Sequence, residues 1–369
     1  MRVAERAFRI GRDVAGVLPR ARAAVTESGD WNPLSARDAR RFGEVALDEL
    51  ALAGLTLSAP PPRLERTVAA CGAAAAQLSA LGVDGAHSAP DPLQVSAIRR
   101  RRLGSQTYEQ LTFEHDPKLP STLADEGFSG PSTAVLHLCR QGQERRPWLV
   151  WVHGAGQGLP IDLLFSRARR LQDELGFNVA LPVQPGCGVR RAEWPQYPTM
   201  DPLGNVAGMM RAVSEARAVV RWLRPQASAI AVSGVSMGSP VAGLVAHLEP
   251  VDAVAVYTPI AGLNAMIAAH LGRWGPSVSD VAELLSSDAA ARVTAAVDYS
   301  RVEPTPPPER RLIVGAWHDR MAHRQPALAL QERWGGEVYW HPGGHVGHLF
   351  AGGVQAASER FLRAVGSSA

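Results

Sequence analysis

The stretch that decides the fold is Gly234-Val235-Ser236-Met237-Gly238. It follows a short apolar run, residues 229–232, and leads into helix-like sequence, residues 241–248. This order predicts a strand, a tight turn and a helix, with a serine exposed at the turn. A serine hydroxyl becomes a good nucleophile only when a base removes its proton and donors stabilise the resulting charge. The same residues also fit an ordinary glycine-serine turn before a buried helix, so the surrounding sequence has to decide.

Composition points to a globular protein with a sizeable core. The chain has 369 residues, of which 46% are hydrophobic and 20% charged, enough for one large domain or two smaller ones. The formal net charge of +3 is too small to predict a nucleic-acid partner. Lys118 is the only lysine, so arginine makes up the other 37 of the 38 basic residues (38 − 1). This bias is typical of a GC-rich genome, and arginine clusters are therefore not evidence of anion binding.

The cysteines predict neither a disulfide framework nor a metal site. Cys71, Cys139 and Cys187 are odd in number, far apart and without Cys/His ligand spacing. We therefore expect a reducing compartment and a cytoplasmic location. Arginines at positions 2, 6, 9 and 12 interrupt any apolar region of a signal peptide, and no apolar run reaches the length of a membrane span.

Residues 1–104 are predicted to form a helical N-terminal extension. Residues 68–81 are rich in alanine, and five apolar residues recur at helical spacing near the N-terminus: Val3, Ala7, Ile10, Val14 and Val17. We favour a helix packed on the protein's own core, because amphipathic helices are the norm in globular proteins. The alternative is a basic amphipathic helix, residues 1–18, that lies on a membrane surface.

From residue 105 to 369, strand-like and helix-like segments alternate. The continuous apolar run at residues 148–152 is typical of a parallel strand buried on both faces. The alternation predicts an α/β fold with a mostly parallel, doubly wound sheet. The predicted strands are residues 107–115, 132–138, 148–152, 177–183, 229–232, 251–257, 311–316 and 337–340.

Residues 259–308 interrupt this alternation with helix-like pieces and no clear strand. Ligands bind at the carboxyl ends of the strands in such sheets. We therefore expect this insertion to be a helical cap over the site, and the alternative is a surface decoration.

The acid that would orient a catalytic histidine is expected after a late strand. Asp319 lies just past the strand at residues 311–316, where a carboxylate reaches the carboxyl edge of the sheet. Asp298 is the reserve candidate, but it precedes that strand. Asp319 could instead be an ordinary exposed turn residue.

The base candidate is His345, in His341-Pro342-Gly343-Gly344-His345-Val346-Gly347-His348. It follows the last strand by one short loop, whose glycines would let the loop bend back over the serine. His348 is a rival, and His341 comes at the strand end. Three histidines also suggest a metal, but no carboxylate or cysteine accompanies them at ligand spacing, so we expect no metal.

Two backbone N–H groups are expected to stabilise the oxyanion. One is that of Met237, directly after the nucleophile. The other should come from His153-Gly154-Ala155-Gly156-Gln157-Gly158, after the strand at residues 148–152. Ala155 is the preferred donor and Gly156 the alternative. This loop lacks the lysine and the glycine spacing of a phosphate-binding loop.

With these parts in the order Ser, Asp, His, residues 105 to 365 resemble the α/β-hydrolase superfamily, in which Gly234–Gly238 corresponds to the nucleophile elbow. Arg146-Pro147-Trp148, His153-Gly154 and Gly343-Gly344-His345-Val346 look like a poorly characterised group of actinobacterial hydrolases. Ser239 departs from the pattern, because many members have a second glycine there. The N-terminal hundred residues carry no matching motif.

The resemblance implies a serine esterase, or a lipase-like enzyme, that needs no cofactor. Ser236 would attack, His345 would transfer the proton, Asp319 would orient His345, and Met237 with Ala155 would stabilise the oxyanion. Alanine, leucine and isoleucine in the insertion suggest a fairly apolar small-molecule or lipid ester as substrate. A thioesterase, amidase or acyltransferase with the same triad, and a non-catalytic binding protein on this fold, stay open.

Overall fold

One nine-stranded sheet organises the chain, and the computed structural model describes residues 11–27, 29, 31–58, 66–142, 144–275 and 278–367. The strand order is β1-β2-β3-β5-β4-β6-β7-β8-β9. Strands β1, β2, β3 and β5 pair antiparallel, and all pairs from β5 through β9 are parallel. The strands are β1 (Val95–Leu103), β2 (Gln106–His115), β3 (Ser132–Cys139), β4 (Arg146–Val152), β5 (Asn178–Val183), β6 (Ala227–Val235), β7 (Ala253–Tyr257), β8 (Arg311–Ala316) and β9 (Glu337–His341).

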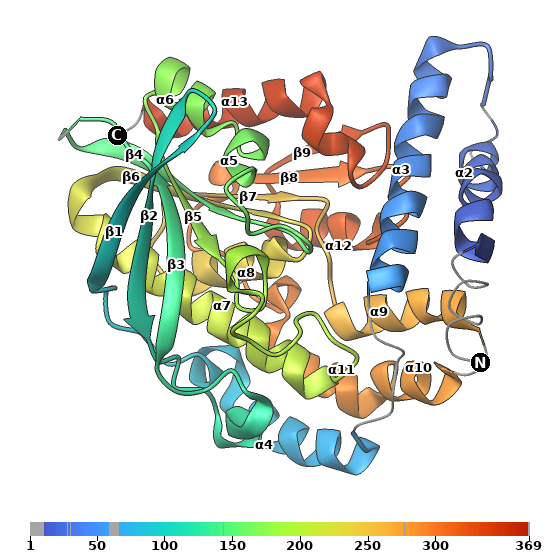
Figure 1. Ribbon diagram of the computed structural model, residues 1–369, viewed down its shortest axis with the longest axis horizontal. Helices are drawn as coiled ribbons and strands as arrows, with labels where there is room; N and C mark the ends of the chain where they lie inside the picture. Colours follow the sequence, from blue (N-terminus) through green and yellow to red (C-terminus); the bar gives the residue numbers. More distant parts are fainter. Residues whose placement is uncertain are drawn as a thin grey trace.

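Helices cover both faces of the parallel part of the sheet (Figure 1). One face packs against α5 (Asp162–Phe165), α6 (Ala168–Leu175) and α13 (Gly352–Gly366). The other packs against α7 (Pro202–Leu223), α8 (Gly238–Leu248) and α12 (Gln325–Trp334). Trp148 and Val150 of β4 face the second layer, and Leu149 and Trp151 face the first. Burial on both faces explains the continuous apolar run in this strand. The predicted doubly wound, mostly parallel sheet is confirmed.

The helical segment between β4 and β5 is divided into α5 and α6, because Arg167 adopts a left-handed conformation with φ 56°. One detail differs from the sequence prediction. Residues 95–103, expected to belong to a helical extension, form β1. The expected boundary at residue 104 therefore falls in the turn between two paired strands.

Strand β1 escaped prediction because it has no buried face. All of its residues except Leu103 are exposed, and four of them are consecutive arginines, residues 99–102. Its conformation is determined by pairing with β2, which leaves no alternation of apolar residues to find. Charges on an outer strand also oppose pairing with a second chain.

Helices α2 (Val17–Thr26), α3 (Ala36–Ser58) and α4 (Val68–Ala86) precede β1. Helix α4 packs against α11 (Asp288–Thr294) and contributes Cys71, Ala74 and Leu78 to the main core. By length and mean hydropathy (1.2), α4 is the one membrane-span candidate within the described residues, although its buried side belongs to that core.

Of the apolar stripe predicted near the N-terminus, only Val14 and Val17 are described, and the two differ in burial. Val3, Ala7 and Ile10 lie outside the described residues. Val17 is buried, whereas Val14 is 47% exposed. Helix α2 packs on α3, where Ala21 and Val25 meet Val45 in a small apolar cluster.

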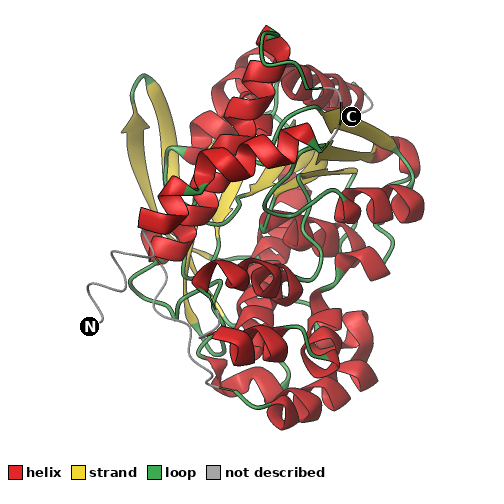
Figure 2. Cartoon of the chain, turned by 90° about the vertical axis from the view of Figure 1, so that its right-hand side faces the viewer, coloured by secondary structure: helices red, strands yellow, loops and turns green. Residues whose placement is uncertain are grey.

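Helices make up most of the described segment between β7 and β8. It contains α9 (Leu263–Leu271), α10 (Ser279–Leu285) and α11, followed by short 3₁₀ turns. Figure 1 shows α3 passing the ends of β8 and β9, with α9 close to its lower end. The view onto this side in Figure 2 has helices in front of the strands. Helix α3 thus lies at the carboxyl ends of β8 and β9.

Candidate active site

Ser236 occupies a tight turn between β6 and α8. Its φ is 52°, a left-handed conformation that costs energy for any residue other than glycine. The turn is held by the Ser236 N–H, which donates to Tyr257 O at 2.9 Å, and by the Ser239 N–H, which donates to Ser236 O at 2.9 Å. Ser236 is half-buried, and its hydroxyl forms no hydrogen bond with the described part of the chain. A strained, accessible serine of this kind is suited to nucleophilic attack.

The two glycines of the motif are required by close packing. A Cβ at Gly234 would overlap the carbonyl group of Gly238. A Cβ at Gly238 would overlap the carbonyl of Val152 and lie 2.6 Å from that of His153. Ser239, the departure from the superfamily pattern, is fully buried, and its hydroxyl donates to Gly234 O at 3.1 Å. The serine therefore fits without disturbing the turn.

The backbone N–H groups predicted to form an oxyanion hole have no hydrogen-bond partner among the described residues. Met237 is 1% exposed, yet its N–H makes no hydrogen bond with any described residue. The N–H groups of Ala155 and Gly156 are likewise unpaired there, whereas that of Gly154 donates to Gln157 Oε1 at 2.6 Å. Buried backbone donors are nearly always paired, so an unpaired one next to a strained serine indicates a binding role. The structure leaves Ala155 and Gly156 as alternatives.

Buried side chains shape the loop that contains Ala155. Asp162, which is 2% exposed, accepts hydrogen bonds from Gly158 N at 2.6 Å and Leu159 N at 3.1 Å. Burial raises its pKa to about 6. His153 Nε2 accepts from Gln184 N at 3.0 Å, and burial lowers its pKa to about 4. His153 is therefore a neutral structural histidine.

Asp319 and His345 lie side by side, although 25 residues separate them in the chain. His345 Nδ1 donates to Asp319 Oδ2 at 2.7 Å, and both side chains are at least 95% buried. The other oxygen, Asp319 Oδ1, accepts from Met321 N at 2.8 Å and Ala322 N at 2.7 Å. This arrangement holds the His345 proton on Nδ1 and leaves Nε2 able to accept a proton.

The pKa of His345 is raised. Burial is the largest influence and lowers the pKa, but the charge and hydrogen bond of Asp319, with the charge of Asp48, outweigh it. No hydrogen bond joins His345 to the Ser236 hydroxyl in the described structure. Such contacts are often long without substrate and shorten in the reacting complex.

The rival residues have other partners. His348 Nδ1 bonds to His345 O, and burial lowers the pKa of His348 to about 3, so its ring is neutral. His341 Nε2 lies 2.5 Å from Glu44 Oε2. Asp298 accepts from Ser300 N at 3.1 Å as the cap of a short 3₁₀ turn. Within the described ranges, no group of three or more histidine, cysteine or acidic residues could hold a metal ion.

The chain is similar to known proteins in sequence and in fold. No protein-family model matches the chain. Two strain forms of a Mycobacterium tuberculosis protein, the uncharacterized proteins Rv2627c and MT2702, are each 33% identical to it over 272 residues. The match covers 70% of this chain but only 64% of each relative's length.

Solved structures are similar over most of the chain. An acetyl xylan esterase from a Paenibacillus species matches with a TM-score of 0.51 at 19% identity, covering 82% of this chain and 96% of the esterase. Acetyl xylan esterase 1 from a Thermoanaerobacterium species has a TM-score of 0.50 at 12% identity, covering 76% and 96%. The protein has the fold of the α/β-hydrolase superfamily. At these identities the likeness concerns the fold alone.

Three carboxylates of α3 lie beside the site. Nothing in the sequence indicated that they would do so. Asp48 and Glu49 are fully buried, and Glu44 is half-buried. Their spacing of four and five residues places them on neighbouring faces of one helix. That spacing was the only available sign in the sequence, because nothing local shows which loop an N-terminal helix will meet.

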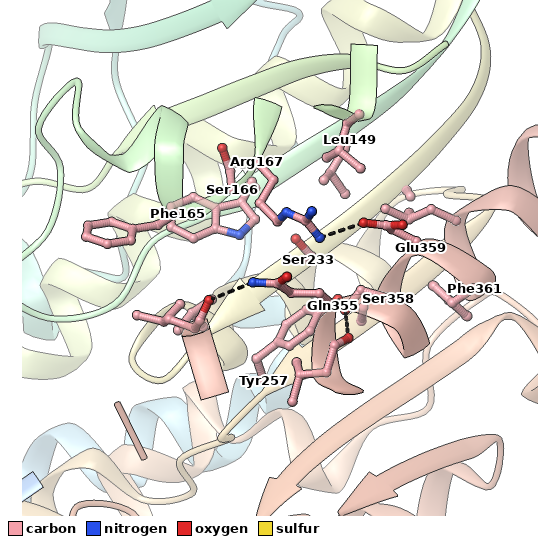
Figure 3. A pocket seen from close by; sticks show the side chains of 18 of the residues that line it. Leu149, Phe165, Ser166, Arg167, Ser233, Tyr257, Gln355, Ser358, Glu359 and Phe361 are labelled. Carbon is pink, nitrogen blue, oxygen red and sulfur yellow. Dashed lines mark hydrogen bonds and ion pairs between the residues drawn. The ribbon is translucent and has the colours of Figure 1, made fainter. Parts of the chain in front are cut away.

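A separate cavity of about 80 Å³ lies between the sheet and helices α5, α6 and α13 (Figure 3). Ion pairing of Arg167 with Glu359, at 2.5 Å, closes one side. Ser233 and His348 line it, but Ser236, Asp319 and His345 do not. It is smaller than the ~300 Å³ at which ligand pockets begin, so we do not assign it to a substrate.

Proposed function

We propose that the protein is a serine hydrolase that cleaves a carboxylic ester through an acyl-enzyme. The observation that carries this proposal is the 2.7 Å hydrogen bond from His345 Nδ1 to Asp319, together with a strained Ser236 whose hydroxyl makes no hydrogen bond with the described residues. Each of the three residues follows the carboxyl end of a parallel strand, where active sites of such sheets occur.

The proposed reaction starts at the ester carbonyl. His345 Nε2 takes the proton of Ser236 as Oγ bonds to the carbonyl carbon, and the carbonyl oxygen becomes an oxyanion. The N–H groups of Met237 and Ala155 would stabilise this oxyanion, with Gly156 as the alternative second donor. The alkoxide then leaves with the proton from His345. Water, deprotonated by the same imidazole, attacks the acyl carbon; the bond from that carbon to Ser236 Oγ then breaks, His345 returns the proton to Oγ, and the acid is released. No step requires a cofactor.

The segment at residues 259–308 is proposed to be a cap that selects the substrate. His270 Nε2, at the end of α9, lies 2.8 Å from Met321 O, which ties this segment to the loop of Asp319. Leu263 and Leu271 are buried, whereas Met266 and Ile267 are only partly buried. The alanine, leucine and isoleucine content of this segment supports a fairly apolar small-molecule or lipid ester as substrate.

A fluorophosphonate probe tests the proposal. Labelling of the wild-type protein that disappears in Ser236→Ala supports a reactive serine. A well-folded wild-type protein that is never labelled would instead favour a non-catalytic binding protein. Comparing hydrolysis of p-nitrophenyl esters, thioesters and amides then separates the esterase from a thioesterase, amidase or acyltransferase.

Cytoplasmic location and peripheral membrane contact through residues 1–18 are also proposals. Val14 and Leu18 are 47% and 60% exposed, as a membrane-contacting face requires. Deleting residues 1–18 should abolish binding to phospholipid vesicles if this contact exists, and unchanged vesicle binding would exclude it.

A further inference from the structure

We propose that helix α3 completes the active site, with Asp48 as the positioning residue that holds the His345 and Asp319 loops together. This inference rests on the proposed serine hydrolase function. Asp48 would touch neither the substrate nor the reacting atoms and would act through His345.

The contacts of Asp48 reach both loops. Its Oδ2 accepts from His345 N at 2.6 Å and from Arg320 N at 3.2 Å, and its Oδ1 accepts from Val346 N at 2.8 Å. Arg320 directly follows Asp319 in the chain. One fully buried carboxylate thus binds the backbone of the base and of the residue after the acid. It is well placed to set the relative position of the two loops.

The glycines of the histidine loop match this helix. A Cβ at Gly344 would lie 2.7 Å from Asp48 Oδ2, and one at Gly343 or Gly347 would overlap the Glu44 carboxylate. None of the three has a positive φ. The sequence suggested that these glycines let the loop bend over the serine. The contacts of all three glycines show that they also leave room for the carboxylates of α3.

Neighbouring charges keep α3 against the loops. Glu49, the next residue, pairs with Arg20 of α2 at 2.7 Å, with Arg273 after α9 at 2.9 Å and with Arg320 at 3.1 Å. Buried charge networks of this kind are costly to break once formed. Because Glu49 binds side chains and not the His345 backbone, it provides a matched control for Asp48.

Asp48 also contributes charge to the base. The charged or titratable groups that face His345 are Asp319 from the loop after β8, Asp48 from α3 and His348 in the following turn. The charge of Asp48 raises the pKa of His345. Burial raises the pKa of Asp48 itself to about 6, so this charge is present mainly above that pH. Removing that charge should therefore shift the pH dependence of reaction at Ser236, which the loss of a purely structural contact would not do.

The experiment compares Asp48→Asn with Glu49→Gln in the full-length protein. Asparagine has nearly the same shape but presents an NH₂ group to backbone donors and carries no charge. We expect fluorophosphonate labelling of Asp48→Asn to be ~10- to 100-fold slower than that of the wild type, as small misplacements of catalytic groups cause. The acid limb of its pH profile should move to lower pH. Glu49→Gln weakens the docking of α3 but leaves the contacts and the charge of Asp48 in place, so it should keep the wild-type pH profile.

Gly344→Ala provides an independent variant if Asp48→Asn does not fold. It keeps every charge but pushes the loop away from Asp48, and Gly352→Ala, with open space around the new methyl, is its control. We expect only Gly344→Ala to slow labelling.

The outcomes separate this inference from the function on which it rests. Absence of labelling in the wild type would refute the hydrolase itself. A labelled wild type with folded Asp48→Asn reacting at the same rate and with the same pH profile would refute the role of Asp48. If Asp48→Asn does not fold, Gly344→Ala reacting like Gly352→Ala would refute it.

Discussion

Replacing Asp319 by asparagine is the sharpest test of the proposed triad. In the wild type, Asp319 Oδ1 accepts two backbone N–H bonds, from Met321 and Ala322, and Oδ2 accepts from His345 Nδ1. An asparagine would keep its oxygen toward the two backbone donors, because an NH₂ group there would leave both unpaired. Its NH₂ group would then face His345 Nδ1.

This exchange would invert the tautomer of the base. A donor facing His345 Nδ1 makes that nitrogen an acceptor, so the ring proton moves to Nε2. Nε2 then has no lone pair with which to take the Ser236 proton. In serine proteases the corresponding change lowers kcat ~10⁴-fold with the geometry intact. We expect a ~10³- to 10⁴-fold loss of kcat/KM here, or about 4–5.5 kcal/mol of transition-state stabilisation.

Hydrolysis of a p-nitrophenyl ester, followed by absorbance, measures the loss, and thermal unfolding checks the integrity of the variant. Asp298→Asn is the matched control, because Asp298 caps a 3₁₀ turn and contacts no triad residue. A folded Asp319→Asn variant that keeps more than a tenth of wild-type activity would refute the reasoning. So would a large loss in Asp298→Asn alone.

Three further outcomes follow from the same geometry. His345→Ala should reduce ester hydrolysis by ~10³-fold or more, whereas His348→Ala should keep the pH profile of the wild type. The reverse result would identify His348 as the base. Because His345 must be neutral to act and its pKa is raised, kcat/KM should fall as the pH drops through a midpoint above 6.5; a midpoint below 6.5 would contradict this environment. Gly238→Ala should unfold the turn or abolish soluble expression, because its methyl would meet the carbonyl of His153 at 2.6 Å; a stable and active variant would contradict the packing.

The local features of the site could be predicted from the sequence. Gly234, Ser236 and Gly238 lie within five residues, and their roles depend on one turn whose steric demands are local. Parallel strands end at one edge, so a serine, an acid and a histidine that each follow a strand are expected to meet there. The Asp319–His345 hydrogen bond agrees with that expectation.

Features without a local signal were missed or misinterpreted. Strand β1 is exposed, so no periodicity marks it, and only pairing with β2 makes it a strand. The glycines near His345 suggested a bending loop, because nothing nearby in the sequence shows a helix packed against them.

The sequence by itself determined the sheet, the elbow and the order of the catalytic candidates, because periodicity and turn chemistry act over a few residues. Only the tertiary structure decided that His345, and not His348, meets Asp319, since that choice depends on which ring the loop turns toward the carboxylate. The tertiary structure alone also placed Asp48 against the loops that contain Arg320 and His345. These residues lie 272 and 297 positions after Asp48 in the chain. A contact across that separation depends on how α3 docks, which local sequence patterns do not encode.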